Sequence, residues 1–408
     1  MYICGTTSRM SKHLSRLGSE QTTATKLMEC IPSLQPIILG ASERIEQERQ
    51  LPGHLLEALH QHSLFRMLLP EEFGGLEVCP PTFLAIIEEI AALDASTAWC
   101  LCQGNGCAMA AAFVPNAVAT QIWKNDNHSV LAWGPGTGQA KPVKDGFLLT
   151  GRWSFVSGGK HARWLGGFAD ILDENGQPRL DTKGRPLQRT FLFPSDKAKR
   201  HETWDVIGLL GTGSDDFAAE DILVPETHLL ARDDQSTRIC SAPLYAFPAI
   251  SLYAIGFAGT ALGVARGVLE AFIETVAEKI PRAQTNKLRD NNAIQADVGR
   301  SQGRLAAAHA FLKQEITEIW EAVCISGTLS IDQRMRIRLS STYAIHEAKT
   351  VVDTLYDHAG ATAIFSSSPF ERRFRDIHTI SQQIQGRQVH FQTVGSFLLG
   401  NEPDLRLV

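Results

Sequence analysis

The chain has 408 residues, of which 44% are hydrophobic and 20% charged, and its formal net charge is −5. This composition is that of a globular protein and excludes a disordered or fibrous chain. The slight acidity gives no indication of nucleic acid or an anionic membrane as a partner. The length exceeds that of one ordinary hydrophobic core, so two or three domains are expected.

Eight cysteines in a chain of this length are too few for a disulfide framework. Cys100, Cys102 and Cys107 lie in an alanine-rich run whose spacing matches no metal signature, so we interpret them as buried, reduced thiols of a cytoplasmic protein and predict no metal site. The first 19 residues lack the apolar stretch of a secretory signal and are expected to be a loose tail or an early start. The longest apolar run, residues 107–115, is too short to cross a bilayer.

The first zone of the chain, residues 25–128, has the period of helices. Apolar side chains recur at offsets of 0, 3, 4 and 7, the helical pattern, at Phe83, Ile86, Ile87 and Ile90. Thr82 directly precedes this run and is a candidate N-cap. Residues 68–75, Leu-Leu-Pro-Glu-Glu-Phe-Gly-Gly, interrupt the pattern and predict a loop. The zone is therefore predicted to be an α-helical domain.

The middle zone, residues 129–240, consists of short apolar runs separated by turn signals. Runs at 130–133, 147–150 and 190–193 read as strands, and the pairs Asp145-Gly146 and Asn175-Gly176 read as turns. About six short strands without intervening helices favour an antiparallel barrel or sandwich over βαβ units.

The last zone, residues 241–408, returns to the helical period. Three apolar stripes recur at three- and four-residue steps, within residues 262–276, 305–323 and 341–355. Helices of this length and spacing predict a four-helix bundle. The order is thus helical, then β, then helical, and a ligand is expected where the β domain meets the two helical ones.

Several short motifs then carry a resemblance to a known family. They are Leu-Pro-Glu-Glu-Phe-Gly-Gly at 69–75, Asp-Ala-Ser-Thr-Ala-Trp at 94–99, Ile-Gly-Leu-Leu-Gly-Thr-Gly-Ser at 207–214 leading to 220–225, and the segments 359–361 and 370–376. In this order and spacing they resemble the acyl-CoA dehydrogenase fold over roughly residues 25–400. The resemblance implies an α+β, mainly α protein that binds a flavin.

The segment after Arg375-Asp376 separates two chemistries that this fold hosts. Acyl-CoA dehydrogenases and oxidases often place a catalytic glutamate there, but no glutamate follows until Glu402. Glu270 and Glu274 read better as solvated charges on a helix than as a substitute base. The Arg-Asp-Ile-His segment ending at His378 is instead similar to the oxygenase components of two-component flavin monooxygenases, including 4-hydroxyphenylacetate hydroxylase and indole-acetate monooxygenase types.

This second resemblance implies a cofactor, partners and a reaction. Reduced flavin, FMNH2 or FADH2, would come from a separate NAD(P)H:flavin reductase and react with O2 through a C4a-hydroperoxide. The substrate would be a small aromatic or heteroaromatic molecule, an indole among them, and the assembly a homotetramer. The alternatives are an acyl-CoA dehydrogenase or oxidase with bound FAD, related flavin chemistry on nitrogen or sulfur, and a catalytically idle relative that serves as a binding or structural subunit.

The resemblance assigns two catalytic candidates. His378 would donate a proton to the activated oxygen, a task for a group that titrates near neutrality. Ser157 would bond flavin N5 or O4, and Phe155 would face the flavin ring. The alternative interpretations are a surface or capping histidine and a strand-end serine that satisfies a turn.

The resemblance also implies residues for two further contacts, one with the flavin phosphate and one with the flavin of a neighbouring subunit. Arg282 lies in the connection where the family places a phosphate-binding arginine, and a guanidinium suits that ligand. Gly360, Phe365 and Ser366 lie in the late glycine-containing loop, which touches the flavin of a neighbouring subunit in tetramers of this fold. A solvated loop arginine is the alternative for Arg282.

Three residues are candidates for the substrate side. Trp133 could wall an aromatic substrate by stacking, or it could be barrel core. His161 could line the flavin or the substrate, or make a structural bond. Cys107 stands where some hydroxylases of the family place a histidine that deprotonates a phenol, which favours a non-phenolic substrate such as an indole.

Overall fold

The computed structural model describes residues 4–232, 234–276, 278–282 and 285–404. Helices form the first part of the chain. These are α1 (Cys4–Glu48), α2 (Gly53–Gln61), α3 (Pro80–Leu93), α4 (Ala95–Ala108) and α5 (Asn116–Ala119). The loose tail expected at the N-terminus is wrong from Cys4 onward, because α1 is already helical there and meets no proline before Pro32. Thr82 is also not the N-cap that was expected, because α3 already starts at Pro80. Proline suits the first turn of a helix, where the backbone N–H that it lacks would have no partner within the helix.

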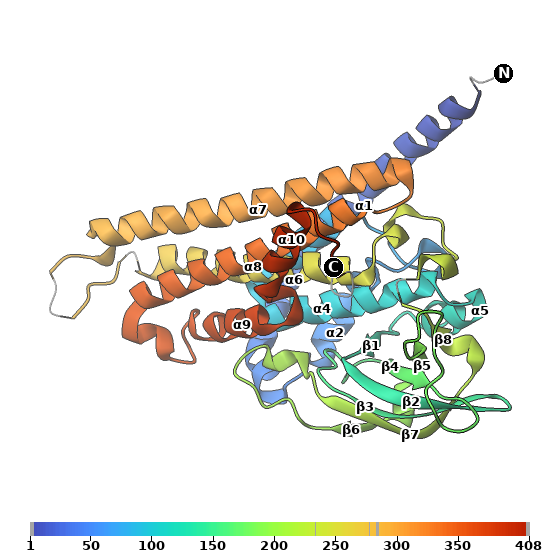
Figure 1. Cartoon of the computed structure of the whole chain (residues 1–408). Coiled ribbons are helices and arrows are strands. Elements are labelled where there is room, and N and C mark those ends of the chain that lie inside the picture. The colour runs from blue at the N-terminus through green and yellow to red at the C-terminus, as the bar shows by residue number, and fades with distance from the viewer. Residues whose placement is uncertain (1–3, 233, 277, 283–284, 405–408) are drawn as a thin grey trace.

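The middle zone forms one sheet of eight strands (Figure 1). They are β1 (Leu131–Trp133), β2 (Gly136–Val143), β3 (Gly146–Trp153), β4 (Trp164–Ile171), β5 (Gln188–Pro194), β6 (Lys199–His201), β7 (Asp216–Val224) and β8 (Leu229–Leu230). Their order is β6-β7-β3-β2-β4-β5-β8, with β1 paired to β4.

Two pairings correct the expectation of a wholly antiparallel sheet. Strand β4 runs parallel to both β1 and β2, whereas the other pairings are antiparallel. The reason is that β2 and β3 form a hairpin, and the chain then crosses to the far side of β2 before β4 begins. Residues 154–163 make this crossing, so the segment with Ser157 leaves the sheet at its end.

A buried tryptophan fixes the end of β3 from which this crossing starts. The Trp153 indole is fully buried and donates from Nε1 to the Phe168 carbonyl oxygen at 2.9 Å. Cβ atoms at Gly138, Gly151 and Gly167 would each lie within 2.9 Å of its ring, closer than side chains can pack. Glycine is therefore required at these three positions, and the strand end is held rigidly.

The C-terminal zone consists of helices packed on one another and on α3. They are α6 (Ala249–Val276), α7 (Asn292–Ser326), α8 (Ile331–Ala359), α9 (Glu371–Gln382) and α10 (Val389–Leu398). The three predicted stripes are buried along α6, α7 and α8. α6 is long and apolar enough to cross a membrane, but 89% of its most apolar window is buried inside the protein, as in a core helix.

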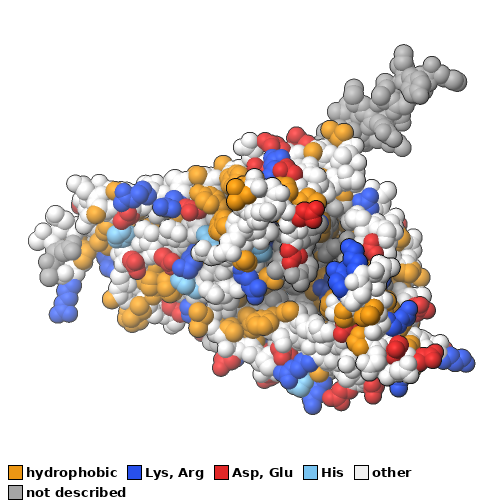
Figure 2. All heavy atoms as spheres, in the orientation of Figure 1, with side chains coloured by type: hydrophobic (Ala, Val, Ile, Leu, Met, Phe, Trp, Pro, Cys, Tyr) orange, Lys and Arg blue, Asp and Glu red, His pale blue; other side chains and the backbone are white. Residues whose placement is uncertain are grey.

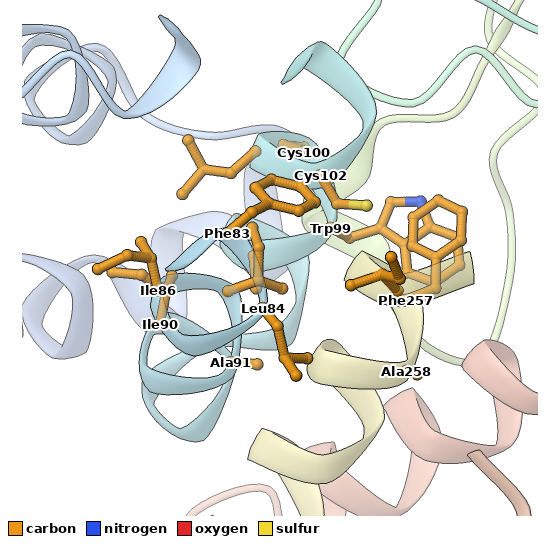
Figure 3. Close-up of a cluster of buried hydrophobic side chains, with 14 of the residues drawn as sticks. Phe83, Leu84, Ile86, Ile90, Ala91, Trp99, Cys100, Cys102, Phe257 and Ala258 are labelled. Atoms are coloured by element: carbon orange, nitrogen blue, oxygen red, sulfur yellow. The ribbon is translucent and has the colours of Figure 1, made fainter. Parts of the chain in front are cut away.

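Helices α3, α4 and α6 share one hydrophobic core (Figure 3). Phe83 of α3 lies beside Cys102 of α4 in this core, Leu84 packs against α6, and Trp99 faces Phe257 of α6. Cys100, Cys102 and Cys107 are buried and free, as predicted. On the face drawn in Figure 2, basic and acidic side chains are interspersed, in keeping with the small net charge.

The glycine turn at 207–214 is held against α9 by a buried carboxylate. The Leu209 N–H donates to Asp376 Oδ1 at 2.6 Å, and a Cβ at Gly208 would lie 2.3 Å from the Arg375 carbonyl oxygen. Arg375 also donates to the Ile207 carbonyl oxygen at 2.6 Å and pairs with Glu46 of α1 at 2.7 Å. The turn therefore joins the sheet to two helical segments.

Burial gives Asp376 an unusual ionisation. Desolvation is the main cause that raises the pKa of Asp376 to about 7; the nearby Asp94 and Glu46 act in the same direction, and the Leu209 N–H and Arg375 oppose the shift. Because the folded-state pKa lies above the ordinary value of about 3.9, the protonated form stabilises the fold. That stability is complete below about pH 4 and is lost as the pH rises through about 7.

We therefore predict that Asp376→Asn makes the protein less sensitive to pH. Asparagine keeps the acceptor oxygen but cannot ionise. Between pH 5.5 and pH 8 the wild type should lose about 2 kcal/mol of unfolding free energy relative to the variant. Urea unfolding at both pH values measures this difference. Asp196→Asn, at an exposed carboxylate, is the control, and an equal pH response in the wild type and Asp376→Asn would contradict the prediction.

Candidate active site

The crossing segment that carries Ser157 is anchored by backbone hydrogen bonds on three sides. The Ser154 N–H donates to the Pro135 carbonyl at 2.9 Å, the Val156 N–H to that of Asp215 at 3.2 Å, and the Gly158 N–H to that of Thr212 at 2.9 Å. The segment is thus fixed to the residue that precedes β2, to the glycine turn and to the residue that follows the turn, so its side chains have defined directions.

Phe155 is held in a strained backbone conformation at the edge of this segment. Its φ is 54°, in the left-handed region that non-glycine residues seldom adopt, and its side chain is 63% exposed. The ring meets Trp204 edge-on, with centroids 6.1 Å apart. Strain of this kind costs about 1–3 kcal/mol and concentrates at functional sites. The conformation presents an aromatic ring outward beside Ser157.

The Ser157 hydroxyl lies in a buried network rather than at an open turn. Ser157 is 7% exposed, and its Oγ accepts a hydrogen bond from Trp99 Nε1 at 3.0 Å. It also lies 2.8 Å from the Ser214 hydroxyl. Trp99 in turn stacks on Phe257 with centroids 3.7 Å apart. A purely turn-satisfying serine would not need these partners from α4 and from the glycine turn.

His378 lies on α9 with one ring nitrogen already bonded. Its Nδ1–H donates to the Phe374 carbonyl oxygen at 2.8 Å, because a carbonyl can only accept. Nε2 lies 3.3 Å from Asp353 Oδ1 of α8. Nε2 is therefore the ring nitrogen that is not committed to the backbone, and it faces a carboxylate.

Ser157 and His378 are connected through the glycine turn. Asp376, two residues before His378, binds the Leu209 N–H, and the Leu209 carbonyl accepts from Thr212 Oγ1 at 2.8 Å. The Thr212 carbonyl holds the backbone beside Ser157, as described above. The catalytic roles of Ser157 and His378 remain predictions.

A line of aromatic rings leads from Ser157 to Cys107. Trp99 stacks on Phe257, which is parallel to Tyr253 at 5.8 Å, and Tyr253 Oη lies 3.3 Å from Cys107 Sγ. Burial raises the pKa of Cys107 to about 12 and the pKa of Tyr253 well above its ordinary value. Both groups are therefore neutral at physiological pH.

Trp133 adjoins this line. Gln103 Nε2 donates to the Trp133 carbonyl oxygen at 3.3 Å and to Cys107 Sγ at 3.7 Å. The Arg232 guanidinium lies 4.4 Å from the centroid of the Trp133 ring and also donates to Thr190 at 2.6 Å. The two predicted substrate residues Trp133 and Cys107 are thus brought together.

His161 lies in a different environment. Its ring packs on Phe65 at 5.3 Å, and its Nε2 is buried with no hydrogen-bond partner in the described part of the chain. Burial, with His60 nearby, lowers the pKa of His161 to about 3, so the ring is neutral. This environment is that of a core histidine, and the predicted contact with flavin or substrate remains a prediction.

The predicted phosphate and subunit-contact residues lie near the end of α6. Arg282 is exposed in the connection that follows α6. Lys279, from the same connection, donates to the Ala359 carbonyl at 2.5 Å and to Thr362 Oγ1 at 2.8 Å, which brings this connection to the loop of Gly360. In that loop Gly360 has a φ of 64°, Phe365 is 62% exposed and Ser366 is exposed.

Sequence reasoning missed several residues of this site. Trp99 and Ser214 stand inside motifs that carried the family resemblance, yet the motifs gave no sign that the two side chains converge on Ser157. Arg232 and Tyr253 carried no sequence signal, because their partners come from distant segments. Among the described residues, no group of three or more His, Cys, Asp and Glu side chains could hold a metal ion.

Comparison with known proteins agrees with this geometry. Residues 37–119 match the N-terminal domain of acyl-CoA dehydrogenases and residues 255–387 match their C-terminal domain. An indole-3-acetate monooxygenase of Pseudomonas putida is 30% identical over 378 residues, which cover 91% of this chain and 94% of the relative. The flavin-dependent monooxygenase oxygenase subunit HsaA of Rhodococcus jostii is 26% identical over 362 residues, covering 86% and 92% of the two chains.

A solved structure shows the same fold over nearly the whole chain. XiaF from a Streptomyces species, in complex with FADH2 and glycerol, has a TM-score of 0.89 and 23% identity, covering 96% of this chain and 99% of that one. The fold and site thus define a protein with the acyl-CoA dehydrogenase fold, as predicted. Within that class, the chain belongs to the family of flavin-dependent monooxygenases represented by these relatives.

The residues present fit a flavin. An outward aromatic ring at Phe155 can lie against a flat ring system, and the Ser157 hydroxyl beside it can bond a ring nitrogen or carbonyl. The predicted flavin-dependent monooxygenase and its flavin cofactor are confirmed over the alternative of an acyl-CoA dehydrogenase or oxidase.

The strain at Phe155 leads to a prediction about stability. Phe155→Gly and Phe155→Ala both remove the exposed ring, but only glycine adopts a positive φ without a steric cost. The glycine variant should therefore be more stable than the alanine variant by about 1 kcal/mol, while both bind flavin more weakly than the wild type. Thermal unfolding and flavin titration measure the two effects. Equal stability of the two variants would show that Phe155 stores no backbone strain.

Proposed function

We propose that the chain is the oxygenase component of a two-component system that hydroxylates a small aromatic or heteroaromatic substrate, indoles included. It would receive reduced flavin, FMNH2 or FADH2, from a separate NAD(P)H:flavin reductase and use O2 as the second substrate. The observation that carries the proposal is the Ser157 hydroxyl, which is buried against Trp99 at the start of the aromatic line that ends at Cys107. Relatives named indole-3-acetate monooxygenase and resorcinol hydroxylase support it.

The flavin, when bound, supplies the electrons that activate O2. The chain's own residues would orient the flavin and supply a proton to the activated oxygen. Phe155 would lie against the flavin ring, and Ser157 would bond N5 or O4. His378 would hold a proton at Nε2, because Nδ1–H is already committed to the Phe374 carbonyl. Asp353 Oδ1 lies 3.3 Å from Nε2 and would orient the ring for this role.

The environment of Cys107 favours a substrate that needs no deprotonation. With a pKa of about 12, Cys107 is a neutral thiol and cannot serve as the base for a phenol at physiological pH. An indole ring, in contrast, is reactive toward electrophilic oxygen without losing a proton. Trp133 would wall the ring by stacking, and Arg232 beside it adds a positive charge that suits an anionic substituent.

The flavin phosphate and the assembly complete the proposal. Arg282 would bind the phosphate, with Lys279 holding the neighbouring loop in place. The exposed Phe365, together with Gly360 and Ser366, would touch the flavin of another copy in a homotetramer. The enzyme would work in the cytoplasm, where the free thiols of its core stay reduced.

The function is tested by the form of flavin that the protein uses. The purified protein should consume O2 and convert indole-3-acetate only when an independent reductase and NADH supply reduced flavin. Oxygen uptake and product chromatography measure the reaction, and heat-denatured protein controls for uptake by free reduced flavin. Dye reduction with an acyl-CoA and no reductase would instead indicate a dehydrogenase and overturn the proposal.

His378→Ala tests the proposed proton donor. The variant should give about 10²-fold less product per flavin oxidised, the lower end of general-acid effects, with the lost oxygen recovered as hydrogen peroxide. Reduced-flavin affinity should stay near that of the wild type, since the ring is hydrogen-bonded to the Phe374 carbonyl and faces Asp353 rather than the Ser157 network. His54→Ala, at an exposed histidine of α2, is the control. Wild-type product yield in His378→Ala would move the role to another residue.

A further inference from the structure

The Ser157 hydroxyl is the second member of a chain of hydrogen bonds that runs through the interior. Trp99 Nε1 lies 3.0 Å from Ser157 Oγ, which lies 2.8 Å from Ser214 Oγ. Ser214 Oγ lies 2.7 Å from Thr212 Oγ1, and Thr212 Oγ1 lies 2.8 Å from the Leu209 carbonyl oxygen. We call Trp99, Ser157, Ser214, Thr212 and the Leu209 carbonyl the hydroxyl relay.

The direction of every bond in the hydroxyl relay follows from counting protons. A carbonyl oxygen only accepts, so the one proton of Thr212 goes to Leu209. Thr212 must then accept from Ser214, which uses the one Ser214 proton. Ser214 must in turn accept from Ser157, which uses the one Ser157 proton. The indole N–H of Trp99 only donates, so it gives its proton to Ser157.

Burial protects this arrangement from water. Ser157 is 7% exposed, Ser214 3% and Thr212 2%, so solvent offers few alternative partners. Reversing any one bond would leave a buried donor or acceptor without a partner, which costs more than an ordinary hydrogen bond is worth. The relay is also fixed at its far end, since Leu209 is bound through its N–H to Asp376.

The relay leaves Ser157 with one remaining lone pair and no free proton. A hydroxyl oxygen has two acceptor positions and one donor. Trp99 occupies one acceptor position and Ser214 takes the donor, so toward the site Ser157 can only accept. The flavin ring differs at N5 in its two redox states: reduced flavin carries an N5–H donor, and oxidised flavin presents an N5 lone pair. An acceptor-only hydroxyl therefore bonds the first and opposes the second.

We propose that Ser214 and Thr212 are positioning residues, which orient the Ser157 hydroxyl so that the site selects flavin with a protonated N5. Trp99 holds the Ser157 oxygen in place. This inference rests on the proposed function, in which Ser157 faces N5. It extends that function by giving the preference for reduced flavin a cause within the chain. The expected size is about tenfold in affinity, the effect of one hydrogen bond made in one state and lost in the other.

The test uses the two affinities of the intact protein rather than turnover. The dissociation constants for oxidised and for anaerobically reduced flavin are measured by titration, and the midpoint potential of bound flavin by dye equilibration. Ser214→Ala removes the acceptor of the Ser157 proton, which can then be donated to oxidised N5. The ratio of the dissociation constant for oxidised flavin to that for reduced flavin should fall about tenfold. The midpoint potential of the bound flavin should then fall by about 30 mV, because a tenfold change in an equilibrium constant corresponds to that value for a two-electron couple.

Thr212→Val should lower the same ratio of dissociation constants by a different change in the hydroxyl relay. Without the Thr212 oxygen, in Thr212→Val, the Ser214 proton turns to Ser157 and releases the Ser157 proton, so the ratio should fall in the same direction. Thr212→Ser keeps the hydroxyl and should restore the wild-type ratio. Trp99→Phe should change both affinities alike, because it leaves the direction of the relay intact. Ser340→Ala, at a buried hydroxyl bonded within α8, is the matched control.

The outcomes separate this inference from the proposed function. If the wild type binds reduced flavin and hydroxylates its substrate while Ser214→Ala and Thr212→Val keep the wild-type ratio, the positioning role is overturned and the function stands. If the wild type binds neither form of flavin, both fail. A fall in the ratio in both variants, with Thr212→Ser and Ser340→Ala unchanged, would support the inference.

Discussion

The hydrogen bond from the Leu209 N–H to the buried Asp376 carboxylate is the contact on which the rest of the site depends. It fixes the glycine turn between the sheet and α9, and that turn supplies the Thr212 and Ser214 hydroxyls. The same short stretch of α9 presents His378 two residues later. One buried carboxylate thus sets the relation between two catalytic candidates that belong to different parts of the fold.

Several energetically unfavourable features of the structure, namely backbone strain and a buried acidic group, lie around this contact. Leu209 and Phe155 both have positive φ values, Asp376 is buried with a raised pKa, and Gly208 permits a backbone approach that no side chain would allow. Such strain persists only where surrounding contacts over-determine the backbone. Those contacts come from the rigid end of β3 at Trp153 and from Arg375 of α9, which pairs with Glu46. Stability gained by close packing therefore maintains a site that would not form by itself.

The site divides its work between two kinds of interaction. Polar groups around Ser157 use its proton and one of its two acceptor positions, which leaves a single acceptor for a ligand. Apolar and aromatic groups from α4 and α6 extend from there to Cys107, where the titratable groups are held neutral by burial. This division suits a reaction in which a flavin must be oriented at one end and an uncharged ring held at the other.

The sequence alone determined the order of helical and β zones, because apolar periods of 3.6 and 2 are local properties, and its motifs pointed to the family and to Ser157 and His378. It could not determine that β4 runs parallel to β2, since strand direction depends on how the chain crosses the sheet. Nor could it reveal that Trp99 and Ser214 meet at Ser157, 58 and 57 residues away. Only tertiary packing decides such contacts, because a side chain's partner is chosen by position in space and not by spacing in the chain.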